Sequence, residues 1–191
     1  MKDFNKYKLI LASKSPRRQQ LLKELGFNFE LLTKDVDESF PENLKAHEIP
    51  LFLCRKKAEA FDEELKDDTI VITADTIVWI DDQVLNKPEN FDDAVRMLKI
   101  LSGKMHEVYT GVCLKSKKKT KTFYAVTRVY FKALTQEEIE YYINNFNPFD
   151  KAGAYGAQEW IGYIAIEKIE GSYFNVMGLP VRELYEELLK F

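Results

Sequence analysis

Two adjacent arginines stand where a strand is expected to end and a helix to begin. The stretch SKSPRR begins at Ser13 and places Arg17 and Arg18 after Ser15, the expected N-cap, and a proline. A helix N-terminus offers unpaired N–H groups and the positive end of the helix dipole, which favour phosphate. Arginine adds bidentate donors that match phosphate oxygens. The stretch therefore indicates either an anion site or an ordinary capped helix with two solvated charges.

A single carboxylate lies within the most apolar segment of the chain. Asp75 stands between residues 70–72 and 77–80, where a buried carboxylate is costly unless it is paired, hydrogen-bonded or bound to a metal. Glu38 follows a predicted strand, and Mg²⁺ typically takes one or two protein carboxylates together with substrate phosphates. The alternatives are a turn cap for Asp75 and a solvated loop for Glu38.

Further polar residues are weaker signals when taken one at a time. Lys57 lies on a predicted helix and Lys87 precedes a proline, so both could be ordinary surface charges. The loop DKAGAYGAQ is more informative, because its glycines permit close backbone approach. It carries Lys151, and Gln158, whose amide supplies both a donor and an acceptor for a base edge. The phosphate loop G-x-x-x-x-G-K-[ST] and the G-x-G-x-x-G fingerprint are absent from the sequence.

These residues must be positioned by strands that alternate with helices, which predicts a mixed α/β fold. We expect strands at residues 7–12, 28–32, 67–82, 107–115, 121–132 and 161–169. We expect helices at residues 16–25, 46–65, 91–103, after a Thr135–Glu138 capping box, and from residue 181 onwards. The 191 residues, without repeat or linker, suit one domain.

Composition limits the classes of partner. The formal net charge is −3, so no general basic surface attracts nucleic acid. The basic turn at residues 115–121 could bind nucleic acid, but a solvated hairpin tip without interleaved aromatic residues is the simpler interpretation. Two cysteines indicate neither a disulfide framework nor a metal finger, and the first apolar run is too short for a signal or membrane segment. We expect a cytoplasmic protein that binds neither nucleic acid nor membrane.

Eight short motifs then occur in a characteristic order: ASKSPRR, VDES, KKA, ADT, NKP, SGKMHEVYTG, DKAGAYGAQ and GSYFNVMGLP. Together they closely resemble the Maf family of nucleoside triphosphate pyrophosphatases, over nearly the whole chain. The resemblance implies a single Maf-like domain, residues 1–191, with a mixed twisted sheet, flanking helices and two lobes around a nucleotide-binding cleft, as in inosine triphosphatases. It also implies hydrolysis between the α- and β-phosphates, a divalent metal (Mg²⁺ or Mn²⁺), a possible homodimer and an association with restraint of cell division (septum formation).

The resemblance also assigns roles by position. It implies that Asp75 is the proton acceptor, and it matches Glu38, Lys57 and Lys87 to site positions of the family. With these positions in hand, we expect Glu38 and Asp75 to hold the metal. We expect the substrate to be bound by Ser13, Ser15, Arg17, Arg18, Lys57, Thr76, Lys87, Lys151 and Gln158. The subgroup that this chain resembles prefers dTTP and UTP, with specificity positions at Arg17, Thr76 and Gln158.

Three positions depart from the usual family pattern: Ala157 replaces Ile, Asn86 replaces Glu and Lys56 replaces Glu. The first leaves fine base selectivity open. Two other functions also remain open from the sequence, a 7-methyl-GTP pyrophosphatase of the same family and a non-catalytic nucleotide-binding regulator of cell division.

Overall fold

The computed structural model describes residues 7–191. Contacts divide these residues into two compact units, each assembled from separate stretches of sequence. The first unit contains residues 7–75, 110–125 and 178–191, and the second contains residues 76–109 and 126–177. The expectation of one domain over residues 1–191 stays a prediction, and its first six residues lie outside the described part.

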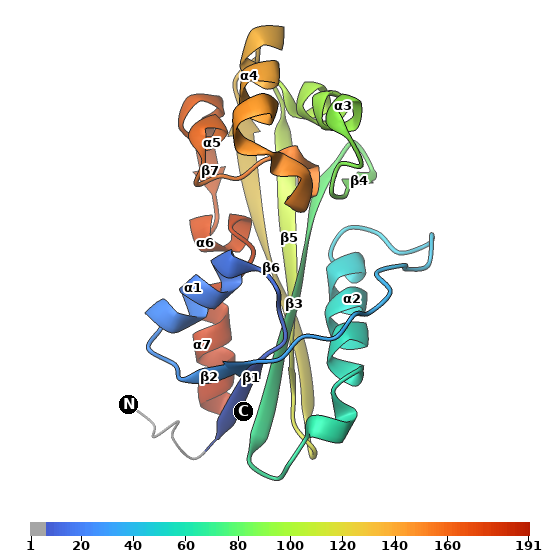
Figure 1. Ribbon diagram of the computed structural model, residues 1–191, viewed down its shortest axis with the longest axis vertical. Helices are drawn as coiled ribbons and strands as arrows, with labels where there is room; N and C mark the ends of the chain where they lie inside the picture. Colours follow the sequence, from blue (N-terminus) through green and yellow to red (C-terminus); the bar gives the residue numbers. More distant parts are fainter. Residues whose placement is uncertain (1–6) are drawn as a thin grey trace. The chain divides into compact units, whose positions relative to one another are not determined.

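The first unit is built on parallel strands. Strand β1 (Lys8–Leu11) pairs in parallel with β2 (Phe29–Leu31) and with β3 (Thr69–Ile80), so that Leu9 lies opposite Phe29 and Ile70 (Figure 1). Its helices are α1 (Pro16–Glu24), α2 (Glu48–Glu59), the 3₁₀ turn η2 (Asp62–Glu64) and α7 (Val181–Lys190). Parallel strands joined by a helix, as β1 and β2 are joined by α1, are the usual parts of an α/β sheet.

The second unit is antiparallel at its edges. Strand β4 (Gln83–Leu85) pairs with β3, and β7 (Ile166–Glu170) pairs with β6 (Thr120–Phe131). The helical elements of this unit are α3 (Phe91–Leu101), α4 (Gln136–Phe146), η3 (Pro148–Asp150), η4 (Ala152–Ala154), α5 (Trp160–Ala165) and α6 (Tyr173–Val176). With β5 (Met105–Lys115), the full strand order is β2-β1-β3-β5-β6-β7, and β4 pairs β3 off this path. The predicted mixed α/β fold is confirmed.

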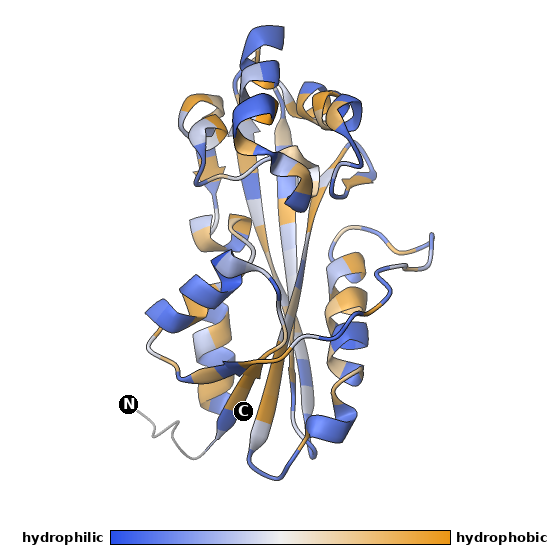
Figure 2. Ribbon diagram, in the orientation of Figure 1, coloured by the Kyte–Doolittle hydropathy of each residue, from blue (hydrophilic) through white to orange (hydrophobic). Residues whose placement is uncertain are grey.

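Each unit has its own apolar core. In the first, Ile10 and Val71 from neighbouring strands pack with Phe61, and Figure 2 shows β1 and much of β3 in the hydrophobic colour. In the second, Leu98 of α3 and Tyr142 of α4 belong to one large buried cluster. No helix in residues 7–191 is long and apolar enough to cross a membrane.

The two cysteines are core residues of the first unit. Cys54 and Cys113 are fully buried and cluster with Ala58. Burial raises the pKa of the Cys54 thiol and raises that of Cys113 to about 11. Both are therefore neutral thiols at pH 7, and neither is an activated nucleophile.

Most predicted elements are confirmed, with one clear error. The expected strand at residues 161–169 is wrong in its first half, which forms helix α5, and only Ile166–Glu170 is a strand. Ile161 and Ala165 are fully buried and four residues apart, so they share one helical face. A short apolar run does not by itself distinguish a buried strand from a buried helix. The edge strand β4 was not predicted.

Candidate functional site

The first group of candidate residues is organised by the start of α1. Ser15 is the N-cap, and its hydroxyl accepts a hydrogen bond from the Arg18 N–H at 3.5 Å, with Pro16 in the first turn. Ser13 lies just before it and accepts from the Ser15 N–H at 3.2 Å. The predicted cap is confirmed, and it directs the helix N-terminus towards the end of β1, where Ser13 is buried.

Arg18 is fixed by backbone carbonyls. Its Nε donates to the carbonyl of Gly178 and its Nη1 to the carbonyl of Ala74, both at 2.7 Å. Burial lowers the pKa of the guanidinium, whereas the nearby carboxylates of Asp75 and Glu38 raise it. Arg18 thus lies within electrostatic range of both candidate metal ligands, and it holds the residue that precedes Asp75 in place.

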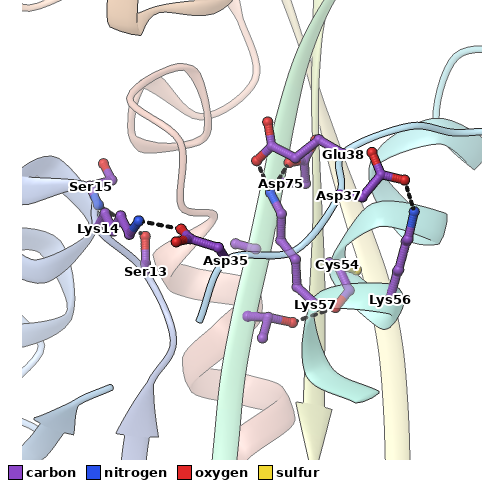
Figure 3. Close-up of polar contacts among 12 residues, drawn as sticks. Ser13, Lys14, Ser15, Asp35, Asp37, Glu38, Cys54, Lys56, Lys57 and Asp75 are labelled. Carbon is purple, nitrogen blue, oxygen red and sulfur yellow. Dashed lines mark hydrogen bonds and ion pairs between the residues drawn. The ribbon is translucent and has the colours of Figure 1, made fainter. Parts of the chain in front are cut away.

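Lys57 joins the two candidate carboxylates. Its Nζ lies 2.5 Å from Oδ1 of Asp75 and 2.7 Å from Oε1 of Glu38. Figure 3 shows the Lys57 side chain reaching from α2 to Asp75 on β3, with Glu38 approaching from the loop. The side chains of Asp75 and Lys57 are only 12% and 16% exposed, whereas that of Glu38 is 49% exposed. The structure therefore brings together an acidic and basic cluster that the sequence only suggested.

Two contacts set the position of α2, which carries Lys57. The Thr73 hydroxyl on β3 donates to the carbonyl of Cys54 at 2.6 Å. A Cβ built on Gly111 of β5 would lie 2.5 Å from the carbonyl carbon of Pro50, so only glycine permits this approach of helix and strand. The glycine of the YTG motif is thus explained by packing.

The acidic loop before α2 is held by a second ion pair. Asp37 lies 2.9 Å from the Nζ of Lys56 and accepts from the hydroxyl and the N–H of Ser39. These hydrogen bonds, first from the Ser39 hydroxyl and then from Lys56, lower the pKa of Asp37 to about 2. Lys56, which replaces a usual Glu, therefore anchors the loop that carries Glu38.

The donor set suits a divalent cation that is shared with a substrate. Glu38 and Asp75 converge on a single cationic group, and carboxylate oxygens with phosphate oxygens are the ligands that Mg²⁺ prefers. Among residues 7–191, no three His, Cys, Asp or Glu side chains gather as a metal site. The two carboxylates fit a metal whose other ligands would be phosphate oxygens and water.

The remaining candidates belong to the second unit. Thr76 follows Asp75 on β3, and Lys87 follows β4. The 150–158 loop approaches both segments, because Gly153 donates its N–H to the carbonyl of Asn86 at 3.1 Å. A Cβ on Gly153, where φ is +67°, would lie 2.9 Å from a methyl carbon of Val78.

Two residues that the sequence analysis did not identify support this loop. The Tyr142 hydroxyl donates to the Glu159 carboxylate and accepts from the Gly156 N–H at 3.0 Å. Glu159 also lies 3.0 Å from the Nζ of Lys151, whose side chain is only 8% exposed. Tyr142 carried only an apolar helical signal, so no sequence pattern could have identified its hydroxyl.

Comparison with known proteins decides the family. The model of the Maf-like protein family matches residues 8–191, almost every residue that the structure describes. The chain belongs to the Maf family. The ordered motifs on which the resemblance was based therefore lie on a Maf fold. Seven of the candidate site residues belong to the first unit, and they lie at the start of α1, in the loop before α2, on α2 and on β3.

Maf relatives with full-length similarity carry a specific name. A protein of Phocaeicola vulgatus named dTTP/UTP pyrophosphatase is 53% identical over 191 residues, covering all of this chain and 99% of the relative. One of Flavobacterium johnsoniae with the same name is 54% identical over 183 residues, covering 96% and 94% of the two chains. The structure of the Staphylococcus aureus Ham1 protein matches 96% of this chain and 98% of its own, with a TM-score of 0.54 and 14% identity. This last likeness shows that the Maf chain shares its fold with the Ham1 protein.

Proposed function

We propose that this Maf protein is a nucleoside triphosphate pyrophosphatase that hydrolyses dTTP and UTP to the nucleoside monophosphate and pyrophosphate. The observation that carries the chemistry is the Lys57 ammonium held between Asp75 and Glu38. The substrate follows from the relatives about half identical over the full chain, which are named dTTP/UTP pyrophosphatases.

The substrate's own charge explains why basic residues are needed. A nucleoside triphosphate carries several negative charges, which repel an attacking water, so catalysis requires charge neutralisation and positioning. The start of α1 offers N–H groups and the positive end of its dipole. Arg17, Ser13 and Ser15 adjoin this helix start, and Lys57 adds an ammonium. We assign phosphate binding to this group.

Arg18 differs from the other basic residues because its side chain is held in place by hydrogen bonds to the backbone. Two of its five N–H donors already hold the carbonyls of Ala74 and Gly178. Its charge still acts on the site, while its hydrogen bonds keep Asp75 in register on β3. Arg18 therefore positions the catalytic strand as well as lending positive charge to the substrate.

Asp75 is the proposed proton acceptor. The ion pair with Lys57 involves Oδ1, so Oδ2 is the atom assigned to the attacking water. Water adds to the α-phosphorus and gives its proton to Asp75, the bond from that phosphorus to the bridging oxygen breaks, and pyrophosphate leaves with the electron pair. Glu38 and Asp75 would hold a divalent ion, whose positive charge would offset the negative charge that develops on the phosphates.

Base recognition is assigned to the second unit. Gln158 offers both a donor and an acceptor, which match the carbonyl and N–H groups of a thymine or uracil edge. Thr76 and Lys151 are assigned to substrate binding beside it, and Lys87 to the phosphates. The support for this assignment is the contact of the 150–158 loop with the segments that contain Thr76 and Lys87.

Pyrophosphate release from separate dTTP, UTP, CTP, dATP, GTP and 7-methyl-GTP samples tests the proposal, with Mg²⁺ or Mn²⁺ and with a chelator. Metal-dependent release that favours dTTP and UTP is expected. Release from 7-methyl-GTP alone would overturn the substrate assignment, and release of orthophosphate instead of pyrophosphate would overturn the reaction.

A further inference from the structure

A short turn places Gln158 between two anchored residues. The Glu159 N–H donates to the carbonyl of Gly156 at 3.0 Å, which closes the turn at residues 156–159. Gln158 lies inside this turn and is partly buried. Whatever holds Gly156 and Glu159 therefore also holds the backbone of Gln158 between them.

Both ends of the turn meet one hydroxyl. The Tyr142 hydroxyl accepts from the Gly156 N–H at 3.0 Å and donates to Oε2 of Glu159. Burial, and then the hydrogen bond to Glu159, raise the pKa of Tyr142, so the hydroxyl keeps its proton and its role as a donor. The Tyr142 ring is fully buried in the core of the second unit, so packing restricts the position of its hydroxyl.

Packing transmits the anchor to Gln158. A Cβ on Gly156 would lie 2.8 Å from Cδ of Glu159 and 3.1 Å from Nε2 of Gln158. The two side chains thus lie over the same bare backbone, so the Glu159 carboxylate and the Gln158 amide are both close to Gly156.

Lys151 balances the charge of this arrangement. Its Nζ lies 3.0 Å from Oε1 of Glu159 and 2.6 Å from Oδ1 of Asp150. Each oxygen of Glu159 therefore has a separate partner, a phenol on one side and an ammonium on the other. A carboxylate held at both oxygens has little rotational freedom.

We propose that Tyr142 and Glu159 are positioning residues that fix the orientation of the Gln158 amide and thereby set the base selectivity of the enzyme. This inference rests on the proposed function, because it requires Gln158 to contact the base. It adds two residues that need not touch the substrate, and it makes selectivity depend on a helix, α4, that carries none of the candidate binding residues.

Two variants test this inference. Tyr142→Phe keeps the buried ring and removes the hydroxyl, and Glu159→Gln keeps the shape of the side chain and removes its charge. The matched controls are Tyr141→Phe, on the exposed side of the same helix, and Glu167→Gln, exposed on β7. For each variant, kcat and KM are measured with dTTP, UTP, CTP and GTP, and exchange of the Gly156 amide hydrogen is followed by NMR.

The expected result is a fall of about ten-fold in kcat/KM for dTTP and UTP relative to CTP and GTP, as for one lost hydrogen bond between Gln158 and the base. The loss should lie in KM, because the base is remote from the reacting phosphorus. The Gly156 amide should exchange faster in Tyr142→Phe, and both controls should match the wild type.

Other outcomes would overturn the inference. If the Gly156 amide exchanges faster and selectivity is unchanged, the Tyr142 hydroxyl holds the loop but does not determine the base selectivity. If all four nucleotides lose activity equally in Glu159→Gln, the role is structural only. In both cases the wild type still releases pyrophosphate and the proposed function stands, whereas a wild type inactive on every nucleotide would overturn both proposals.

Discussion

Lys57 and Asp75 form a close ion pair, with the ammonium nitrogen 2.5 Å from the carboxylate oxygen, although they are 18 residues apart in the chain. The pair explains how a carboxylate is tolerated on a buried strand, since an opposite charge and a hydrogen bond offset the cost of desolvation. It also leaves Asp75 with one oxygen outside this contact. The same pair thus offsets the cost of burying the carboxylate, and the proposed mechanism assigns its other oxygen to the attacking water.

Replacement of Asp75 by Asn should abolish turnover without unfolding the protein. Asn has the same size but does not accept the proton of water, so kcat for pyrophosphate release should fall by about 10²-fold or more. The matched control is Asp82→Asn, in the exposed turn after β3, where φ is +56° and Asn is well tolerated. Near wild-type kcat in Asp75→Asn would refute the assignment of Asp75 as the base.

Metal dependence should respond to Glu38. Removal of the cation by a chelator should stop pyrophosphate release, and Glu38→Gln should raise the metal concentration needed for half-maximal activity by about ten-fold, as expected for a lost charged ligand. Glu42→Gln, an exposed carboxylate in the same loop, serves as the control. A metal titration curve that Glu38→Gln does not shift would remove Glu38 from the ligand set.

Arg18→Lys should weaken the fold as well as the activity. An ammonium does not reproduce the planar fork that reaches Ala74 and Gly178, so the free energy of unfolding should fall by about 1–3 kcal/mol. Urea denaturation measures this change, and Arg182→Lys on the exposed face of α7 provides the comparison. Equal stability of the two variants would mean that the backbone contacts of Arg18 contribute nothing measurable.

The sequence predicted those parts of the fold that depend on local signals. Ser15 followed by proline, and Thr135 with Glu138, are local capping patterns, and both caps are confirmed. The run at residues 161–169 has no such capping pattern. A short helix buried on one face and a buried strand can both have an apolar sequence of this length, so the sequence did not distinguish them. The structure also shows a close contact there that the sequence did not reveal, since a Cβ on Gly162 would lie 2.0 Å from the carbonyl oxygen of Ala157.

The residue types of the candidate site could be predicted from the sequence, but most of the contacts between its side chains could not. The isolated carboxylate at Asp75 indicated a partner, but nothing in the sequence showed that Lys57 would be that partner. Arg18 was expected to reach only an anion, and its bonds to Ala74 and Gly178 required the tertiary fold. Tyr142 and Glu159 could not be predicted, because their roles arise from one long-range hydrogen bond.

Gln158→Glu should change selectivity. A carboxylate has no donor for the base edge and adds a negative charge, so kcat/KM for dTTP and UTP should fall more than that for the other triphosphates. The kinetic panel that tests the proposed function measures this difference. Equal losses for every base would show that Gln158 only supports the loop.

His106 should make the stability of the protein sensitive to acid. The residue is 1% exposed, and burial lowers its pKa from 6.5 to about 3. Between these two pH values His106 is protonated in the unfolded state and neutral in the folded state. The free energy of unfolding therefore has its full value above pH 6.5 and falls as the pH drops towards 3. The slope from this residue is at most about 1.4 kcal/mol per pH unit.

Comparison of the wild type with His106→Gln and Tyr155→Phe separates the acid sensitivity caused by His106 from that caused by the carboxylates. His106→Gln removes the titrating ring, and its urea denaturation curves between pH 7 and pH 4 should show a smaller loss of stability than the wild type. Tyr155→Phe removes the hydroxyl that lies 2.8 Å from Nε2 of His106 but keeps the burial. Because burial is the cause of the lowered pKa, Tyr155→Phe should keep the wild-type slope. A flattened slope in Tyr155→Phe would instead assign the acid sensitivity to the hydrogen bond.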